Sequence, residues 1–539
     1  MSMIIRCIEK RPLISVVFLI GLMLLPYLHL VPVSIMEARN FITAREMVTD
    51  GNWLLTTMNG MPRYEKPPLP TWLSAIAGYL GGLDNLWAMR LPAVMMIMVI
   101  SVVVFFFSKA LKLSPWLCGI NSFITATSFY VTAIIFEAPW DIYTHGFMLM
   151  ALLYLYYFLY EEKHSFKNIL LAGVLGGFSF LSKGPISMYA LMLPFLLAFG
   201  VNFSFRQYKG KIFGLLASIV LMLVVGGWWY IYVRWQDPET FVAIAQKETS
   251  NWGSYNVRPF YYYWSFFAQS GLWTIPALVA LIYPYMKKRV SNLQAYRFSL
   301  LWTLFSVLLL SLVPEKKTRY LMPVLIPLSI NTGFYIEYIC RRFSSMKKSE
   351  RIPVYLNFGL ISFAGLVIPL GLIFIEKITN FNFWWVLIFS VFPLMGIIMF
   401  RKLIRKEIIG LVYGAIALYV FIFLLLPPLY KNQLLQSRQR MEIFKNMVKE
   451  EQLQVFAYGY IPPEAIWFYG DKIPFVENPD DMLTIQMDNF ALLTNIDISK
   501  EDWTGFFKIE EKTMLDLNNF QGKNNRLISR FYVLHKKVE

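Results

Sequence analysis

The chain has 539 residues, of which 57% are hydrophobic and 16% are charged, and its formal net charge is +16. Soluble domains carry about a quarter charged residues, so this composition and a mean hydropathy of +0.50 exclude a soluble globular protein. The basic residues gather in short segments between apolar runs, so the positive charge does not call for a nucleic-acid partner.

Apolar runs of about 20 residues recur between Pro12 and Pro428, and each is long enough to cross a hydrocarbon core of roughly 30 Å. No small-residue cleavage site follows the first run, so we interpret it as a membrane anchor and not as a signal peptide. The pattern predicts an α-helical polytopic membrane protein with about thirteen transmembrane helices, at residues 12–33, 87–108, 114–134, 141–160, 168–183, 186–203, 212–234, 263–285, 297–313, 320–340, 353–375, 382–400 and 407–428.

The basic residues predict the orientation of these helices, because short loops rich in Lys and Arg stay in the cytoplasm. Such clusters fall on alternate sides of the predicted spans, beginning with Arg6, Lys10 and Arg11. We therefore predict a cytoplasmic N-terminus and, with an odd number of spans, a C-terminus outside. The three cysteines fall near predicted cytoplasmic ends, so we expect no disulfide framework on the outer face.

The first external loop, residues 34–86, is charged and rich in Pro and Trp. Polar groups at a membrane boundary usually mark a substrate path or a reaction centre. We therefore expect the function to depend on this loop, whose charged residues include Glu37, Arg39, Arg45, Glu46, Arg63, Glu65 and Lys66.

Further charged residues fall outside in the same topology. Asp141 begins the fourth span, Lys183 ends the fifth, and a tight turn between the ninth and tenth spans has the sequence PEKKTRY, residues 314–320. Its cations Lys316, Lys317 and Arg319 oppose the positive-inside bias. A basic cluster retained against that bias indicates an anionic ligand, most simply a phosphate.

The composition changes after residue 429. Strand-like runs alternate with polar helical stretches, and these runs lie at residues 454–459, 473–478, 490–496 and 530–536. The alternation predicts a small α/β domain on the outer face, residues 430–539, following a transmembrane domain at residues 1–429. This domain has no phosphate loop, metal spacing or nucleophile motif that we can identify, so we expect it to act as a scaffold or to position an acceptor.

The outer charges fit the transfer of a sugar from a lipid-phosphate carrier. A carboxylate, Glu37 or Asp141, would take the proton of the acceptor hydroxyl. Cations would hold the phosphate and stabilise the charge that grows as it leaves; the candidates are Lys66, Lys183, Lys316, Lys317 and Arg319. The four histidines are scattered over both faces, so we expect no metal site, and we expect no cofactor.

Four motifs in order resemble those of the GT-C glycosyltransferases, over about residues 12–335. MEARNFITAREM and RYEKPPLPTW resemble the first external loop of that family, WDIYTHGFML its acidic motif in the fourth span, LSKGP its Lys-Gly-Pro motif, and KKTRYLMPVLIPL its basic turn. In particular, the chain resembles the bacterial lipid A aminoarabinose transferases and, more distantly, the protein O-mannosyltransferases.

The resemblance implies a polyprenyl-phosphate-linked sugar as donor and an envelope acceptor, lipid A or another glycolipid, on the periplasmic face of the bacterial inner membrane. It implies that Lys66, Lys317 and Arg319 hold the donor phosphate. The family carries an Asp-Glu pair where this chain has Met36-Glu37, so either Glu37 or Asp141 would be the base, or the reaction would rely chiefly on stabilising the leaving phosphate. We also expect a monomer, and further substrate contacts from Arg39, Arg63, Tyr64, Glu65, His145 and Tyr320.

Each residue also has a structural interpretation. Glu37 could cap or salt-bridge its own helix, Lys66 could extend along apolar surface to reach water, and Lys183 could cap the fifth span. Asp141 and His145 lie one helical turn apart and could simply bond each other. A transporter is the competing class of protein. Within the enzyme class, protein Ser/Thr or a polysaccharide is the alternative acceptor.

Overall fold

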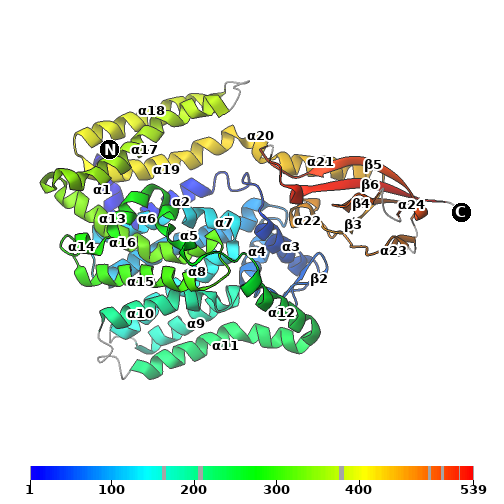
Figure 1. The fold of residues 1–539 in the computed structure, drawn as a ribbon, viewed down its shortest axis with the longest axis horizontal. Coiled ribbons are helices and arrows are strands. Elements are labelled where there is room, and N and C mark those ends of the chain that lie inside the picture. Colours follow the sequence, from blue (N-terminus) through cyan, green and yellow to red (C-terminus); the bar gives the residue numbers. More distant parts are fainter. Residues whose placement is uncertain are drawn as a thin grey trace. The chain divides into compact units, whose positions relative to one another are not determined.

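The computed structural model describes residues 2–160, 165–203, 211–375, 382–483, 487–498, 503–520 and 522–537. The chain divides into two compact units, drawn together in Figure 1. The first, here called the helical unit, comprises Met1–Pro26, Glu65–Pro70 and Arg90–Leu429. The second, the sheet unit, comprises Tyr27–Tyr64, Thr71–Met89 and Tyr430–Glu539, so the predicted domain boundary after residue 429 is one of several places where the chain passes between them.

Within the described residues, eight helices are long and apolar enough to cross a membrane. The helices α6 (Pro115–Ala126) and α7 (Phe129–Glu137) would form a ninth span, bent by 41°. The eight are α5 (Leu86–Ala110), α8 (Pro139–Tyr160), α9 (Ser165–Lys183), α11 (Ile212–Gln236), α15 (Leu293–Leu312), α17 (Lys348–Ile375), α18 (Phe383–Ile404) and α19 (Ile408–Leu429).

Shorter elements complete the helical unit. They are α1 (Ser2–Lys10), α2 (Pro12–Leu24), the π-helix η1 (Met188–Met192), α10 (Leu193–Asn202), α12 (Pro238–Ser254), η3 (Phe260–Tyr263), η4 (Phe266–Trp273), α13 (Thr274–Ala280), α14 (Tyr283–Met286), η5 (Thr318–Leu321), α16 (Met322–Arg342) and η6 (Phe343–Ser345).

Each of the thirteen predicted runs contains a helical segment, but the count of thirteen spans stays a prediction. The helix α2 has only 13 residues. The run at residues 263–285 is broken inside η4, where Gly271 adopts φ 63° and ψ −108°. That backbone conformation lies outside the helical region and is open mainly to glycine.

Glycines let α9 and α11 approach closely, and the two helices lie side by side in Figure 1. A Cβ atom on Gly226 of α11 would lie 2.7 Å from the carbonyl oxygen of Gly177 and 2.5 Å from the Cβ of Phe180, both on α9. Small residues at such crossings stabilise helix pairs in membranes through van der Waals contact. Gly177 and Gly226 are therefore packing residues.

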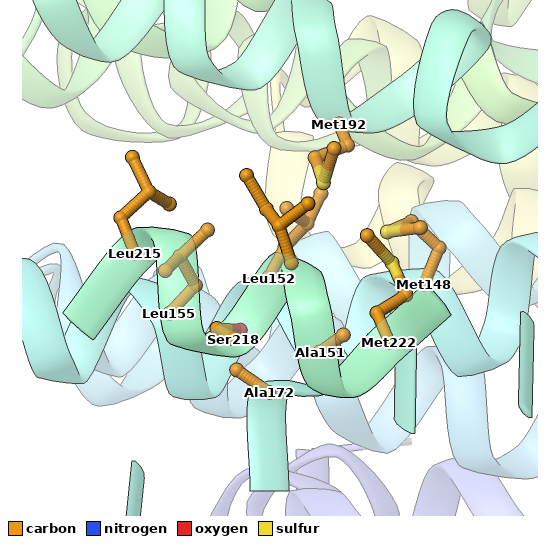
Figure 2. Close-up of a pocket in the computed structure, with 10 residues that line it drawn as sticks. Met148, Ala151, Leu152, Leu155, Ala172, Met192, Leu215, Ser218 and Met222 are labelled. Carbon is orange, nitrogen blue, oxygen red and sulfur yellow. The ribbon is translucent and has the colours of Figure 1, made fainter. Parts of the chain in front are cut away.

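The helices α8, α9 and α11 and the π-helix η1 surround one small cavity, shown in Figure 2. Its volume is about 10 Å³, room for about one water molecule. Its lining is apolar apart from Ser218, so it is no site for a charged substrate. The lining residues are Met148, Ala151, Leu152, Leu155, Ala172, Met192, Leu215, Ser218, Ile219 and Met222.

The sheet unit contains a four-stranded sheet in the order β3-β4-β6-β5. The first pair of strands is parallel and the other two pairs are antiparallel. Short helices accompany the sheet, so the C-terminal region has the α/β character predicted from the sequence. The elements are α20 (Lys431–Leu434), α21 (Gln436–Glu450), β3 (Gln454–Tyr458), α22 (Pro463–Tyr469), α23 (Pro479–Leu483), β4 (Asn489–Thr494), α24 (Trp503–Phe506), β5 (Phe507–Asp516), η8 (Asn525–Leu527) and β6 (Ile528–Lys536).

Two details of the predicted strands are wrong. The run at residues 473–478 forms only one isolated bridge, between Phe475 and Ala457, and not a strand. The strand β5 was not among the predicted strands, and it begins directly after the short helix α24. The strand β5 is an edge strand with mostly exposed, charged side chains, so it lacks the apolar alternation that identifies a strand in a sequence.

Most of the first external loop belongs to the sheet unit and shares its core. The helix α3 (Ile35–Thr49) contributes Phe41 and Met47 to a cluster that also contains Val455 and Trp467. The strands β1 (Thr57–Met58) and β2 (Met61–Pro62) form a hairpin, and α4 (Leu69–Gly81) follows. The turn between β1 and β2 is Asn59-Gly60, with φ angles of 57° and 77°, and Asn-Gly is the pair favoured in tight hairpins.

Arg45 links α3 to the C-terminal part of the sheet unit. Its guanidinium donates to the carbonyl oxygens of Ile466 (3.2 Å) and Trp467 (3.3 Å), the last turn of α22. It also lies 5.5 Å from the centroid of the Trp467 ring. Burial lowers the pKa of Arg45. Because its charge satisfies the end of a helix, Arg45 has a structural role in this unit.

The glycine contact between α9 and α11 predicts a difference between two adjacent positions. Gly226→Ala forces its new methyl group into α9 and should cost about 1–3 kcal/mol. Gly227→Ala adds the same group where nothing lies within 4 Å, and should leave stability unchanged or raise it. The apparent melting temperature in detergent measures both. Equal effects at the two positions would contradict the packing described.

Candidate active site

Three ends of helices in the helical unit bring charged residues together. Asp141 lies in the first turn of α8, Lys183 is the last residue of α9, and Arg319 lies in the short helix η5 just before α16. The positive charges of Lys183 and Arg319 both interact with the Asp141 carboxylate. Residues far apart in the sequence therefore form one charged cluster.

The centre of this cluster is an ion pair between Asp141 and Lys183. Their side chains are only 2% and 6% exposed, so the pair is almost completely removed from water. One carboxylate oxygen, Oδ1, accepts from the ammonium, and Oδ2 has no hydrogen-bond partner among the described residues. The ammonium also lies 5.2 Å from the centroid of the Tyr320 ring. The Oδ2 atom is itself shielded from solvent, so one buried carboxylate oxygen keeps unused hydrogen-bonding capacity.

The LSKGP motif fixes Lys183 at the end of its helix. Gly184 follows with φ 74°, a left-handed conformation that ends helices, and its N–H donates to the carbonyl of Phe180 at 2.7 Å. A side chain at Gly184 would come within 2.9 Å of the Tyr230 hydroxyl. The helix must stop here, and this stop sends the Lys183 side chain to Asp141.

Arg319 is the cation of the basic turn that faces this pair. It makes no ion pair within 4 Å in the part of the chain that the structure describes, and its Nε atom is shielded from solvent without a hydrogen-bond partner there. Its charge acts on both Asp141 and Lys183. An anion would give this guanidinium the partner it lacks.

Lys66 belongs to the same cluster. Its charge acts on Lys183, and its ammonium forms an ion pair with Glu248 of α12 at 3.2 Å. Lys183 and Arg319 thus act on the buried Asp141 carboxylate, and Lys66 adds a third positive charge near Lys183. The excess of positive charge suits an anionic ligand such as a phosphate.

The other two lysines of the basic turn have partners within it. The Lys316 ammonium donates to the carbonyl oxygens of Val313 (2.5 Å) and Arg258 (3.1 Å), and burial lowers its pKa. The Lys317 ammonium lies 2.5 Å from Glu315. These contacts hold the turn in place, so a donor-binding role for either lysine remains a prediction.

Three further predicted residues lie in the helical unit. His145 is buried on α8, one turn after Asp141, and its Nδ1 has no hydrogen-bond partner among the described residues. The Tyr320 hydroxyl donates to Glu315 at 3.2 Å, which keeps its ring beneath Lys183. The Oε2 atom of Glu65 is shielded from solvent and, within the described ranges, unpartnered.

Glu37 forms the capping box of α3 in the sheet unit. Its carboxylate accepts from the N–H of Ser34 at 3.1 Å, and its own N–H donates to the Ser34 hydroxyl at 3.3 Å. The side chain is completely buried. The capping interpretation therefore describes contacts that Glu37 makes, while its role as a base stays a prediction.

The remaining predicted residues of the loop are also in the sheet unit. Arg63 donates to the carbonyl of Arg39 and to the hydroxyl of Thr43, both at 2.9 Å. Tyr64 is buried. The Nε atom of Arg39 has no hydrogen-bond partner in the described part of the chain. Arg63 fastens α3 to the end of the hairpin, and substrate contact by these residues is untested.

The sequence did not identify Glu248 as part of the cluster. It lies 182 residues from Lys66 and belongs to no motif, so only the folded chain brings the two side chains together. An acidic residue on an external amphipathic stretch usually means a solvated face.

Comparisons with known proteins place this geometry in context. The family model of the dolichyl-phosphate-mannose-protein mannosyltransferases matches residues 65–229. An uncharacterised protein of Aquifex aeolicus is 22% identical over 80% of this chain and 81% of its own length. An undecaprenyl phosphate-α-4-amino-4-deoxy-L-arabinose arabinosyl transferase of Edwardsiella ictaluri is 26% identical over 62% of this chain. The match covers 61% of that transferase, so the chain spans about three-fifths of its length.

A solved structure shares the fold. ArnT from Cupriavidus metallidurans, crystallised with undecaprenyl phosphate, has a TM-score of 0.70 and 14% sequence identity, over 97% of both chains. Together the fold and the matches define the class of proteins that the chain resembles: polytopic membrane glycosyltransferases with the GT-C fold. Within that class it is similar to the arabinosyl transferases that the comparison with Edwardsiella ictaluri represents.

The buried ion pair predicts a characteristic pattern of stability. Lys183→Met leaves the Asp141 carboxylate buried without its cation, which should cost about 3–5 kcal/mol. The double variant Asp141→Asn with Lys183→Met removes both charges and should recover most of that loss. Thermal unfolding of the purified variants in detergent measures this. A double variant as unstable as Lys183→Met alone would show that the loss comes from packing and not from the unpaired charge.

Proposed function

We propose that this glycosyltransferase moves a sugar from a polyprenyl-phosphate carrier to an acceptor in the bacterial envelope. The observation that carries the proposal is the group of three cations, Lys66, Lys183 and Arg319, around the buried Asp141 carboxylate. Such a group can hold a phosphate at the membrane boundary. The similar transferases named for undecaprenyl-phosphate aminoarabinose support a lipid-linked donor.

In this proposal Lys66 and Arg319 hold the donor phosphate, while Lys183 stays with Asp141. When the bond between the anomeric carbon and the phosphate oxygen breaks, its electron pair goes to the phosphate. Fixed cations stabilise that growing charge in a site shielded from water, and they need no rearrangement to do so. Lys316 and Lys317 contribute by holding the turn that carries Arg319.

Asp141 is the base in the proposed reaction. Its Oδ2 accepts the proton of the acceptor hydroxyl as that oxygen bonds to the anomeric carbon. The support is its place inside the cation group and its unpartnered Oδ2. Lys183 keeps the carboxylate ionised and oriented. Glu37 is the second candidate, and its carboxylate already serves the capping box.

The acceptor is proposed to be lipid A or another glycolipid on the periplasmic face of the inner membrane. The alternation of basic loops supports that orientation, with the N-terminus in the cytoplasm. The cation group comes from one chain, which is consistent with a working monomer. Protein Ser/Thr residues or a polysaccharide are the alternative acceptors, because the same chemistry serves any hydroxyl.

A direct test supplies the purified protein with a panel of radiolabelled polyprenyl-phosphate sugars and envelope extract, followed by identification of the labelled product. We expect label to move to a lipid fraction from at least one donor. Label in protein or polysaccharide would select the alternative acceptors. No transfer from any donor would refute the proposal.

The proposed role of Lys66 predicts a defect in donor binding. Lys66→Ala removes a charge-assisted contact to phosphate worth about 1.5–3 kcal/mol, so the donor KM should rise roughly 10- to 150-fold. Lys247→Ala on α12 removes the same charge from an exposed side chain that pairs with none of the described residues, and serves as the matched control. Similar KM values in both variants would remove Lys66 from the donor site.

The assignment of the base predicts opposite results for two amide substitutions. Asp141→Asn should lower kcat by about 10²–10⁴-fold with donor binding largely kept. Glu37→Gln keeps a capping box, since Gln also serves at that position, and should hold kcat within a few fold. Initial rates at saturating donor decide between them. The reverse pattern would make Glu37 the base.

A further inference from the structure

The ion pair between Lys66 and Glu248 suggests more than a static contact. The Lys66 ammonium lies 3.2 Å from Glu248 Oε2, and the side chains are 22% and 40% exposed. In the proposed function this ammonium binds the donor phosphate. A carboxylate oxygen therefore stands where a phosphate oxygen would have to come, and an incoming ligand can reach the pair from solvent.

Glu248 is well placed to leave. It lies near the end of α12, which follows the membrane-spanning helix α11 directly and is mostly exposed. Among the described side chains of α12, Glu248 alone makes an ion pair or hydrogen bond to a segment outside α11 and α12. Breaking this contact should cost little stability, because an ion pair that is partly exposed to solvent contributes little.

We propose that Glu248 is an exchangeable counter-ion for Lys66: the phosphate displaces it on binding, and it returns to Lys66 when the phosphate leaves. This inference rests on the proposed function and adds a step to it. In the empty site the carboxylate holds the flexible Lys66 side chain in a fixed position, which reduces the conformational entropy lost on binding. Glu248 is thus a positioning residue.

The proposed exchange mainly affects how tightly the site holds the phosphomonoester product. The donor is a phosphodiester with one negative charge. After transfer, the carrier leaves as a phosphomonoester with a charge of about −1.5 to −2 at pH 7. The two phosphate-binding cations, Lys66 and Arg319, would hold this product more tightly than the donor. A carboxylate that competes for Lys66 lowers the affinity for the product and so limits product inhibition.

The test measures the affinity of the purified full-length chain for undecaprenyl phosphate, which is the expected product, and its inhibition constant in the transfer assay. Glu248→Gln removes the competing charge. The dissociation constant and the inhibition constant for undecaprenyl phosphate should each fall about two- to fivefold, the range set by an exposed ion pair. Glu239→Gln makes the same charge change at an exposed position of α12 that pairs with none of the described residues. This control variant should change the dissociation constant and the inhibition constant by less than about 1.5-fold.

A second arm repeats Glu248→Gln in the Lys66→Ala background, where the effect should vanish because the partner is gone. Equal tightening in Glu248→Gln and Glu239→Gln, weaker binding in Glu248→Gln, or an effect that persists without Lys66 would each overturn the inference. Failure of the proposed function looks different: the unmodified chain would not bind undecaprenyl phosphate, and Lys66→Ala would change nothing.

Discussion

The buried ion pair of Asp141 and Lys183 is the interaction on which the candidate site depends. Neither charge could stay so far from water alone, because an unpaired ion in a medium of low polarity costs several kcal/mol. Each therefore holds the other, and the pair joins the first turn of α8 to the last residue of α9. Its position in turn requires that α9 stop at Gly184. One carboxylate oxygen satisfies the ammonium, and the other stays available for chemistry.

The charges around the pair follow a simple electrostatic logic. Lys183 neutralises Asp141, which leaves Lys66 and Arg319 as excess positive charge. Glu248 offsets one of them, so the empty site is close to balanced except at Arg319. Once a ligand has displaced Glu248, two excess positive charges face it, so a phosphodiester leaves one of them unbalanced and a phosphomonoester can balance both. The cations alone would therefore hold the monoester product more tightly than the donor, and in the proposed exchange the return of Glu248 to Lys66 opposes this.

The features of the fold that depend on neighbouring residues were predictable from the sequence. Apolar length predicts the helices of the helical unit, and the Asn59-Gly60 pair marks a tight hairpin turn. Motifs made Asp141 and Lys183 candidate site residues, but did not predict that each is the other's ion partner. The part played by Arg45 and the pairing of Glu248 depend on partners far along the chain, and no local pattern encodes such contacts.

Met36 acquires an explanation from the cap of α3. The sequence from Ser34 to Glu37 has the form S-x-x-E, and both hydrogen bonds of the capping box are present. The helix needs an acid at position 37 for its first turn, whatever the chemistry, but it needs none at position 36. An acid retained at 37 and absent at 36 is what a structural requirement alone would leave. This reasoning supports the proposal that Asp141, on which the charges of Lys183 and Arg319 act, supplies the carboxylate for proton transfer.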